Sequence, residues 1–242
     1  MNMSKQTMIV WQGVSELDGV TPVVVLASFE SANVKTGNMV QTWILRADIA
    51  PNVAIREGSD IAVCGNCPHR GKASGGSGAC YVNPRTPASV WRAFSRGNVR
   101  PLDLAAFKGR KVRFGAYGDP AAVPFEVWQA IAEVADGVTG YTHQWRACDP
   151  RLATVCMASC DSIDEYRAAR RNGWRGFVVR ELGAAKPKGL VQCPATAGKD
   201  NKVTCLTCMQ CGGTGNGRIA SISIEVHGAS ARSFAPLPLS VV

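Results

Sequence analysis

The last quarter of the sequence contains cysteines whose spacing is typical of metal ligands. Cys205, Cys208 and Cys211 are each separated by two residues, and Cys193 lies twelve positions before Cys205. Thiolates at this spacing on a turn can converge on one ion, so we expect these four side chains to bind a metal. Tetrahedral zinc would take four donors from this set and His227, whereas a cubane iron–sulfur cluster would prefer the four cysteines.

A second group of cysteines lies on a Gly- and Ser-rich loop earlier in the chain. Cys64, Cys67 and Cys80 supply three thiols to this loop. Three thiolates on an iron–sulfur cluster leave one iron open to another ligand, and three ligands on zinc leave a position for water. Either metal would therefore be usable in catalysis. The alternative is that Cys64 and Cys67 pack beneath the loop and that His69 and Arg70 are surface residues.

Several polar side chains follow the predicted strands in the middle of the chain. They are Asp119, His143, Arg146 and Asp161. Because the carboxyl ends of parallel strands meet at one edge of a sheet, we expect these side chains to line one pocket and to act in catalysis. Each also has a structural interpretation, since Asp119 before a proline can set a turn, Asp161 can cap a helix, and a single histidine is more often structural.

Alternating strand and helix patterns place these residues. Strands are predicted over 21–28, 39–46, 111–117, 138–142, 153–158, 175–180, 188–192 and 219–226, and helices over 88–96, 123–135 and 162–172. From residue 111 onward the order predicts parallel strands with right-handed crossovers, about six in all with the strand over 39–46. We therefore expect an α/β fold, either a partial (β/α)6 barrel or an open parallel sheet, with a Cys-rich metal-binding segment.

Composition and length suggest how the chain is organised. With 242 residues, of which 46% are hydrophobic and 19% charged, it can bury a substantial core and is not a disordered chain. We expect a β-rich N-terminal segment over 1–32, a barrel-like core over 33–192 that includes the cysteine loop 64–80, and a Cys-rich metal-binding segment with a final strand over 193–242.

The charge of the chain is distinctly basic, with a net value of +9 from 27 Lys and Arg against 18 Asp and Glu. Part of this excess lies in one segment, Arg92–Arg113, which contains a single acid, Asp103. The pattern is typical of a surface that binds nucleic acid or another phosphate-bearing substrate, and equally of a solvated face that keeps the protein soluble.

Long apolar runs are missing from the sequence. The longest, Pro22–Ala27, is far shorter than the roughly 18 to 20 residues that a membrane-spanning helix needs. Near the N-terminus, Met8–Trp11 is apolar, but Gln12, Gly13 and Glu16 interrupt it before a signal-peptide core forms. We therefore expect no membrane association and a cytoplasmic protein whose ten cysteines are reduced thiols or metal ligands.

Taken together, these motifs resemble those of radical-SAM enzymes, in particular the small phage-encoded proteins related to them. The resemblance covers roughly residues 33–212. It is carried by Lys35-Thr36-Gly37, the loop end Cys80-Tyr81, the turn Gly118-Asp119, and the strand end Tyr141-Thr142 followed by Trp145-Arg146. A phage-encoded protein of this kind would act in the host cytoplasm.

This resemblance implies a cofactor and a set of residues that bind it. Cys64, Cys67 and Cys80 would hold a 4Fe–4S cluster whose open iron binds S-adenosylmethionine, with Gly118 and Asp119 near the amino group of that cofactor. The family's usual spacing is Cys-x3-Cys-x2-Cys with Glu in the turn, whereas this chain has Cys-x2-Cys-x12-Cys with Asp. The late cysteines are similar in position to the auxiliary clusters that some of these enzymes carry.

The chain also resembles, more weakly, tRNA-guanine transglycosylases and their DNA-modifying phage relatives, which are TIM barrels with a late zinc site. That resemblance implies a zinc site formed by Cys205, Cys208, Cys211 and His227. Base exchange would use Asp119 or Asp161 as the nucleophile, and the basic segment would hold the phosphate backbone.

The sequence favours a metal-dependent, radical-SAM-like iron–sulfur enzyme. The alternatives are a zinc-containing, transglycosylase-like enzyme that modifies nucleic-acid bases and a non-enzymatic nucleic-acid-binding protein that zinc stabilises.

Overall fold

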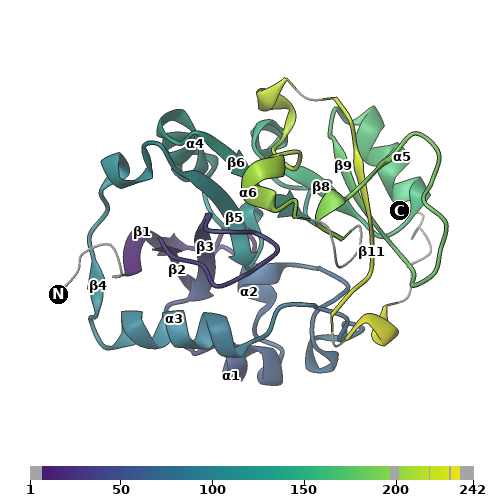
Figure 1. Cartoon of the computed structure of the whole chain (residues 1–242). Helices are drawn as coiled ribbons and strands as arrows, with labels where there is room; N and C mark the ends of the chain where they lie inside the picture. The colour runs from purple at the N-terminus through teal and green to yellow at the C-terminus, as the bar shows by residue number, and fades with distance from the viewer. Residues whose placement is uncertain (1–6, 197–201, 218, 229, 235–242) are drawn as a thin grey trace.

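The chain forms two sheets whose strands are mostly parallel, as the computed structural model in Figure 1 shows. The structure describes residues 7–196, 202–217, 219–228 and 230–234. The strands of the first sheet are β1 (Thr7–Val14), β2 (Pro22–Ser28), β3 (Val40–Arg46), β4 (Val99–Arg100), β5 (Lys111–Tyr117) and β6 (Gly137–Thr139). Their order is β4-β1-β2-β3-β5-β6, with β2 antiparallel to both β1 and β3 and the other pairs parallel.

The second sheet is built from later parts of the chain. Its strands are β7 (Tyr141–Thr142), β8 (Met157–Cys160), β9 (Gly176–Arg180), β10 (Val191–Gln192) and β11 (Ile222–Glu225). They are arranged as β10-β11-β9-β8-β7, and each neighbouring pair is parallel. The predicted α/β class and the parallel pairing are therefore confirmed.

Six helices accompany the sheets. They are α1 (Pro51–Glu57), α2 (Ile61–Cys64), α3 (Arg85–Ser95), α4 (Phe125–Val134), α5 (Ile163–Arg171) and α6 (Cys205–Cys208), counted over the residues that the structure describes. Helices α1, α2 and α3 contact β3, and α5 packs on β8 and β9. The predicted start of α5 is confirmed, because the hydroxyl of Ser162 accepts a hydrogen bond from the backbone N–H of Glu165 at 3.1 Å.

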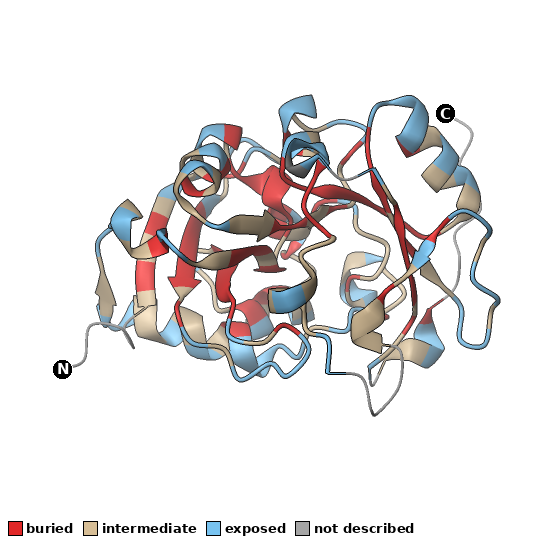
Figure 2. Cartoon of the chain, turned by 45° about the horizontal axis from the view of Figure 1, so that its top comes forward, coloured by how far each residue is buried: buried red, intermediate tan, exposed pale blue. Residues whose placement is uncertain are grey.

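The core lies around the central strands of the first sheet, which Figure 2 shows in red. In β2, residues 23–27 are all buried, and in β3 residues 40–45 are all buried. A strand that is covered on both faces has a nearly continuous apolar sequence, as β2 does, and both strands were predicted from their Val, Ile, Thr and Trp content.

One predicted strand, over 138–142, is divided between the two sheets. Gly140 separates β6 from β7, and its carbonyl accepts a hydrogen bond from the N–H of Met157 at 2.9 Å. A Cβ at this position would lie 2.6 Å from the sulfur of Cys156 and 3.2 Å from the Cβ of Phe114, so a larger residue would force these side chains to move. The strand predicted over 153–158 begins late for a different reason: Asp149 caps a 3-10 turn over 150–154, and β8 starts only at Met157.

Two further differences concern the ends of elements. The strand predicted over 188–192 shrinks to β10, since Gly189 has a φ of 83°, which is outside the extended region. Helix α1 was not predicted, although Pro51 at its first turn and the left-handed Gly58 at its end are typical boundary residues.

The Cys-rich segment is fastened to the second sheet by one buried cation. Arg175, which precedes β9 and is fully buried, donates hydrogen bonds to the backbone carbonyls of Gln210, Gly212, Gly213 and Ala220. Its guanidinium therefore satisfies carbonyls that a short segment with little regular structure would otherwise leave unpaired.

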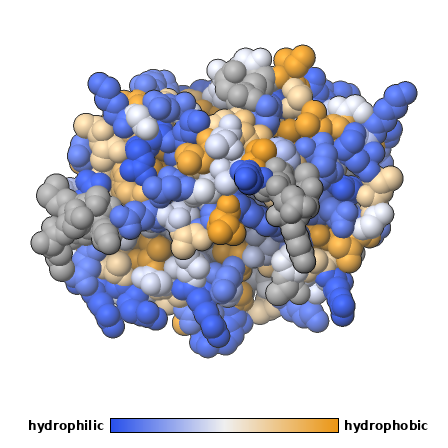
Figure 3. All heavy atoms as spheres, viewed as in Figure 1, coloured by the Kyte–Doolittle hydropathy of each residue, from blue (hydrophilic) through white to orange (hydrophobic). Residues whose placement is uncertain are grey.

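In the described residues, no helix is both long enough and apolar enough to cross a membrane. The face of the molecule in Figure 3 has hydrophilic and hydrophobic residues interspersed.

Candidate functional site

The early cysteine loop is folded around a buried arginine. Cys64 is the last residue of α2, and the guanidinium of Arg70 donates to the Asp60 carboxylate at 3.2 Å and to the carbonyls of Gly58 and Gly65. Arg70 is only 7% exposed. The interpretation of Arg70 as a surface residue is therefore wrong, because its charge is used to hold the loop together.

The three early cysteines lie near one another. Burial raises the pKa of the Cys64 thiol well above its usual value, and the nearby Cys67, Asp60 and Cys80 raise it further. Cys80 is exposed, and its N–H donates to the carbonyl of His69 at 2.9 Å, which brings the end of the loop back to its middle. The three thiols are thus close enough to influence the pKa of Cys64, but their sulfurs do not all lie within 4.8 Å of one another.

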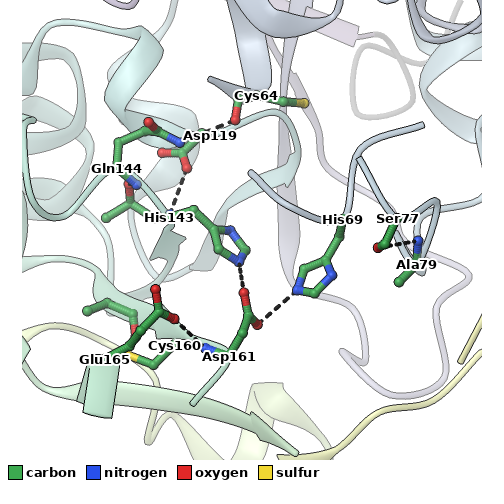
Figure 4. Close-up of polar contacts among 12 residues, drawn as sticks. Cys64, His69, Ser77, Ala79, Asp119, His143, Gln144, Cys160, Asp161 and Glu165 are labelled. Atoms are coloured by element: carbon green, nitrogen blue, oxygen red, sulfur yellow. Dashed lines mark hydrogen bonds and ion pairs between the residues drawn. The ribbon is translucent and has the colours of Figure 1, made fainter. Parts of the chain in front are cut away.

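Two predicted strand-end residues meet a residue of this loop. His143 follows β7 and Asp161 follows β8, which pair in parallel, so both leave the same edge of the second sheet. The Nε2 atom of His69 lies 2.8 Å from Oδ1 of Asp161, and Nε2 of His143 lies 3.4 Å from Oδ2 (Figure 4). We call His69, His143 and Asp161 the His–Asp–His cluster.

Opposing electrostatic effects act within the His–Asp–His cluster. Burial alone would raise the pKa of Asp161, but hydrogen bonds from His143 and His69 outweigh it and hold that pKa far below its usual range. Burial likewise opposes protonation of His143, yet the neighbouring Cys67 and Asp161 outweigh burial and raise the pKa of His143 well above its usual value. The cluster therefore favours positive charge beside the carboxylate.

The late cysteines line one pocket, together with Tyr141 and other residues. The four are Cys193, Cys205, Cys208 and Cys211. Burial raises the pKa of Cys211 to about 12 against a hydrogen bond with Tyr141 that lowers it, and the other three thiols raise it further. Backbone N–H groups of Cys205 and Leu206 donate to the carbonyls of Lys35 and Thr36, so the Lys35-Thr36-Gly37 turn positions α6.

His227 lies apart from this pocket. Its ring stacks on Tyr81 with centroids 5.6 Å apart, and it is not among the residues that line the pocket. The structure thus places Cys193, and not His227, beside the three closely spaced cysteines.

Comparisons of the chain with models of known protein families, with curated proteins and with solved structures find no match.

Asp119 follows β5 of the first sheet and holds His143 in place. Its Oδ2 accepts a hydrogen bond from the backbone N–H of His143 at 2.9 Å, while its Oδ1 accepts from the N–H of Ala121 at 3.0 Å. Burial raises the pKa of Asp119, opposed by these hydrogen bonds. Both carboxylate oxygens are engaged with backbone groups, so Asp119 acts here as a positioning residue.

Asp119→Asn should therefore destabilise the fold by about 1 to 3 kcal/mol, because an amide N–H₂ would replace one of two acceptors that face backbone donors. Urea unfolding measures the change. Asp103→Asn is the matched control, since Asp103 caps Ala105 in the same way at an exposed site, where Asn caps equally well. Equal effects of the two substitutions would contradict the positioning role.

Gly118, the other residue of the predicted cofactor turn, has a packing function in the structure. Its φ is 81°, and a Cβ there would lie 2.6 Å from both the backbone oxygen and the Cβ of Ile44. Glycine is therefore required to bring the end of β5 against β3, whether or not a cofactor binds there.

Arg146 is at the outer edge of the site. Its guanidinium lies 4.0 Å from the ring centroid of Trp145 and 2.9 Å from the carboxylate of Glu165, whose other oxygen accepts a hydrogen bond from the N–H of Asp161. Arg146 is exposed, and its contacts are with Glu165 and Trp145, not with Asp119 or His143.

The basic segment 92–113 uses several of its charges inside the molecule. Arg110 donates to a backbone carbonyl at 2.7 Å, Lys111 donates to the carbonyl of Leu206 at 3.0 Å, and Arg113 donates to the hydroxyl of Tyr81 at 2.6 Å. Three others are exposed, namely Arg92, Arg96 and Lys108. Clustering in sequence therefore overstates the positive charge that this segment offers to a partner.

Proposed function

We propose that the chain is a radical-SAM-like iron–sulfur enzyme. In this proposal Cys64, Cys67 and Cys80 hold a cluster with one open iron, and the four late cysteines hold a second cluster. The observation that carries the proposal is the division of seven cysteines into two sets, one of three on a single loop and one of four around a single pocket.

The separations of the sulfurs bear on the choice between iron–sulfur clusters and single zinc ions. Thiolates bound to one zinc at about 2.3 Å lie at most about 4.6 Å apart. Among the described residues, which include all seven cysteines, only the His–Asp–His cluster brings three or more ligand atoms within 4.8 Å of one another. No three sulfurs of either set lie that close together, and an iron–sulfur cluster, which distributes its thiolates over several irons, would not require them to.

The order of the strands supports a partial barrel as the finer description of the fold. Strands β3, β5 and β6 follow one another in the first sheet, and the chain passes at Gly140 directly into β7, β8 and β9 of the second. Neighbouring parallel strands in chain order are the pattern of a (β/α) barrel.

The residues around the early cysteines would position whatever binds the open iron. When bound, such a cluster supplies one electron to the sulfonium of S-adenosylmethionine. Asp119 orients the segment that begins at His143, and Gln144 donates to the carbonyl of Cys64 at 3.3 Å. These contacts tie the cysteine loop to the ends of β5 and β7 and would keep the open position in one place.

Anaerobic purification tests the proposal. The protein should be brown, absorb near 400 nm, and contain about eight iron and eight sulfide per chain, four for each cluster. A colourless protein with zinc and no sulfide would contradict it. That result would favour the zinc-containing alternatives, and a nucleic-acid binding measurement over a range of salt concentrations would then separate them.

A further inference from the structure

The structure offers a third site that contains no cysteine. We propose that His69, His143 and Asp161 bind one divalent transition-metal ion, separate from both cysteine sets. The proposal does not rest on the iron–sulfur assignment, because its three ligands are two imidazoles and one carboxylate.

The geometry of the three ligand atoms is that of a coordination site. All three lie within 4.8 Å of one another, and they come from the cysteine loop and from the ends of β7 and β8. Ligands about 2.1 Å from one ion are separated by about 3.0 Å in an octahedron and about 3.4 Å in a tetrahedron. Nε2 of His69 lies 2.8 Å from Oδ1 of Asp161 and Nε2 of His143 lies 3.4 Å from Oδ2, and these are separations of this size for a carboxylate that binds the ion through both oxygens.

Hydrogen bonding does not account fully for the arrangement. Nε2 of His143 lies 3.4 Å from Oδ2 of Asp161, which is longer than an ordinary N–H···O hydrogen bond, and no shorter contact satisfies it among the described residues. Buried polar atoms are rarely left unpaired, so each one calls for a reason.

The burial of the Asp161 carboxylate also favours a cation in the His–Asp–His cluster. The side chain of Asp161 is 2% exposed, and those of His69 and His143 are 13% and 21% exposed. A carboxylate buried this deeply needs a cation beside it. A protonated imidazole supplies that cation when no metal is bound, and a divalent ion would supply it with both imidazoles neutral, as metal ligands are.

The ligand types indicate which ions would bind. Two imidazoles and a carboxylate suit Fe²⁺, Co²⁺, Zn²⁺ or Mn²⁺, whereas Mg²⁺ and Ca²⁺ prefer oxygen ligands. Two histidines and one carboxylate on one ion leave further positions open to water or substrate. Phe234 stacks on His69 with centroids 5.3 Å apart and covers that side of the site. The open positions would therefore lie on the side of the early cysteines, near Cys67.

Cobalt binding to the full chain tests the site. Protein purified anaerobically, with whatever metal its cysteines hold, is washed with a chelator and titrated with Co²⁺, and bound cobalt is measured by equilibrium dialysis. The wild type should bind one equivalent without the near-ultraviolet charge-transfer band that marks cobalt on thiolate. Asp161→Asn, which keeps the shape of the side chain, and His69→Ala should each lose this equivalent.

Two matched controls separate ligation from general damage. Asp164→Asn alters an exposed carboxylate at the start of α5, and His227→Ala removes a histidine outside the cluster, so both variants should keep the full equivalent. Circular dichroism establishes that each variant is folded. Unchanged cobalt stoichiometry in folded Asp161→Asn and His69→Ala would overturn the proposal and leave the cluster as a hydrogen-bonded network.

A measurement on the wild type covers the case in which the variants do not fold. The chain has three histidines. Bound Co²⁺ should shift the ring-proton NMR signals of His69 and His143 far outside the normal range and leave those of His227 in place. Absence of shifted histidine signals, or a shift of His227 alone, would also overturn the proposal.

Discussion

Cys80→Ala is expected to remove about four of the eight iron atoms and to weaken S-adenosylmethionine binding at least about 100-fold, with complete loss of any activity that depends on that cofactor. A three-thiolate cluster has no spare protein ligand, so loss of one thiolate removes the cluster and the open iron with it. Cys80 is the best of the three early positions for this test, because it is exposed and its truncation removes little packing. Iron and sulfide content and equilibrium dialysis with the cofactor are the measurements.

Cys148→Ala is the matched control for Cys80→Ala. Cys148 belongs to neither cysteine set and is partly buried, with burial raising the pKa of its thiol to about 12. This variant should keep all its iron and its affinity for the cofactor. If Cys80→Ala keeps its full iron content while remaining folded, the early loop is not a cluster site and only the late cysteines remain as candidates.

Local sequence patterns predicted those elements whose formation depends on residues adjacent in the sequence. The buried runs of β2 and β3 and the capped helix α5 are examples, since apolar content or a Ser162 cap is enough to identify them. The close passage of Gly140 beside Cys156 depends on a contact between segments, and no local pattern reveals it. The same holds for the division of one predicted strand between two sheets.

His69 shows the same limit at the site. Sequence analysis considered His69 only as a surface residue, although it did expect His143 and Asp161 to line one pocket. In the structure His69 reaches Asp161 because the Arg70 guanidinium folds the loop back on itself. A His two residues after a cysteine on a Gly-rich loop was the available signal, but its partner is 92 positions away.

For the cysteines, sequence spacing predicted one part of the late site, and only the tertiary structure settled the other. The two-residue spacing from Cys205 to Cys211 is local and predicted a shared site, whereas the choice between Cys193 and His227 depended on tertiary structure. The charges of the segment 92–113 are a further case, because a sequence shows where cations are but not that Arg113 donates to Tyr81 inside the molecule.

Cys208→Ser should lower the stability of the late segment on the order of 5 kcal/mol and the melting temperature by roughly 10 to 20 °C. Helix α6 has only four residues, and the pocket holds four thiols. Serine has nearly the shape of cysteine but is a poor metal ligand, so the metal is lost and the entropy of ordering the segment is no longer offset. The loss of stability should stay below the metal-binding free energy of roughly 10 to 16 kcal/mol found for zinc-finger peptides. The reason is that Arg175 still donates hydrogen bonds to backbone carbonyls of the segment.

Metal removal provides the internal control for this variant. If the effect of Cys208→Ser acts through the metal, wild-type protein stripped by a chelator under reducing conditions should melt at the same temperature as the stripped variant. Their free energies of unfolding should agree within about 1 kcal/mol. The difference between wild type and variant should therefore exist only in the loaded proteins. A difference that persists after stripping would mean that Cys208 stabilises the segment by packing, and equal melting temperatures and metal contents of the loaded proteins would mean that the late cysteines bind no structural metal.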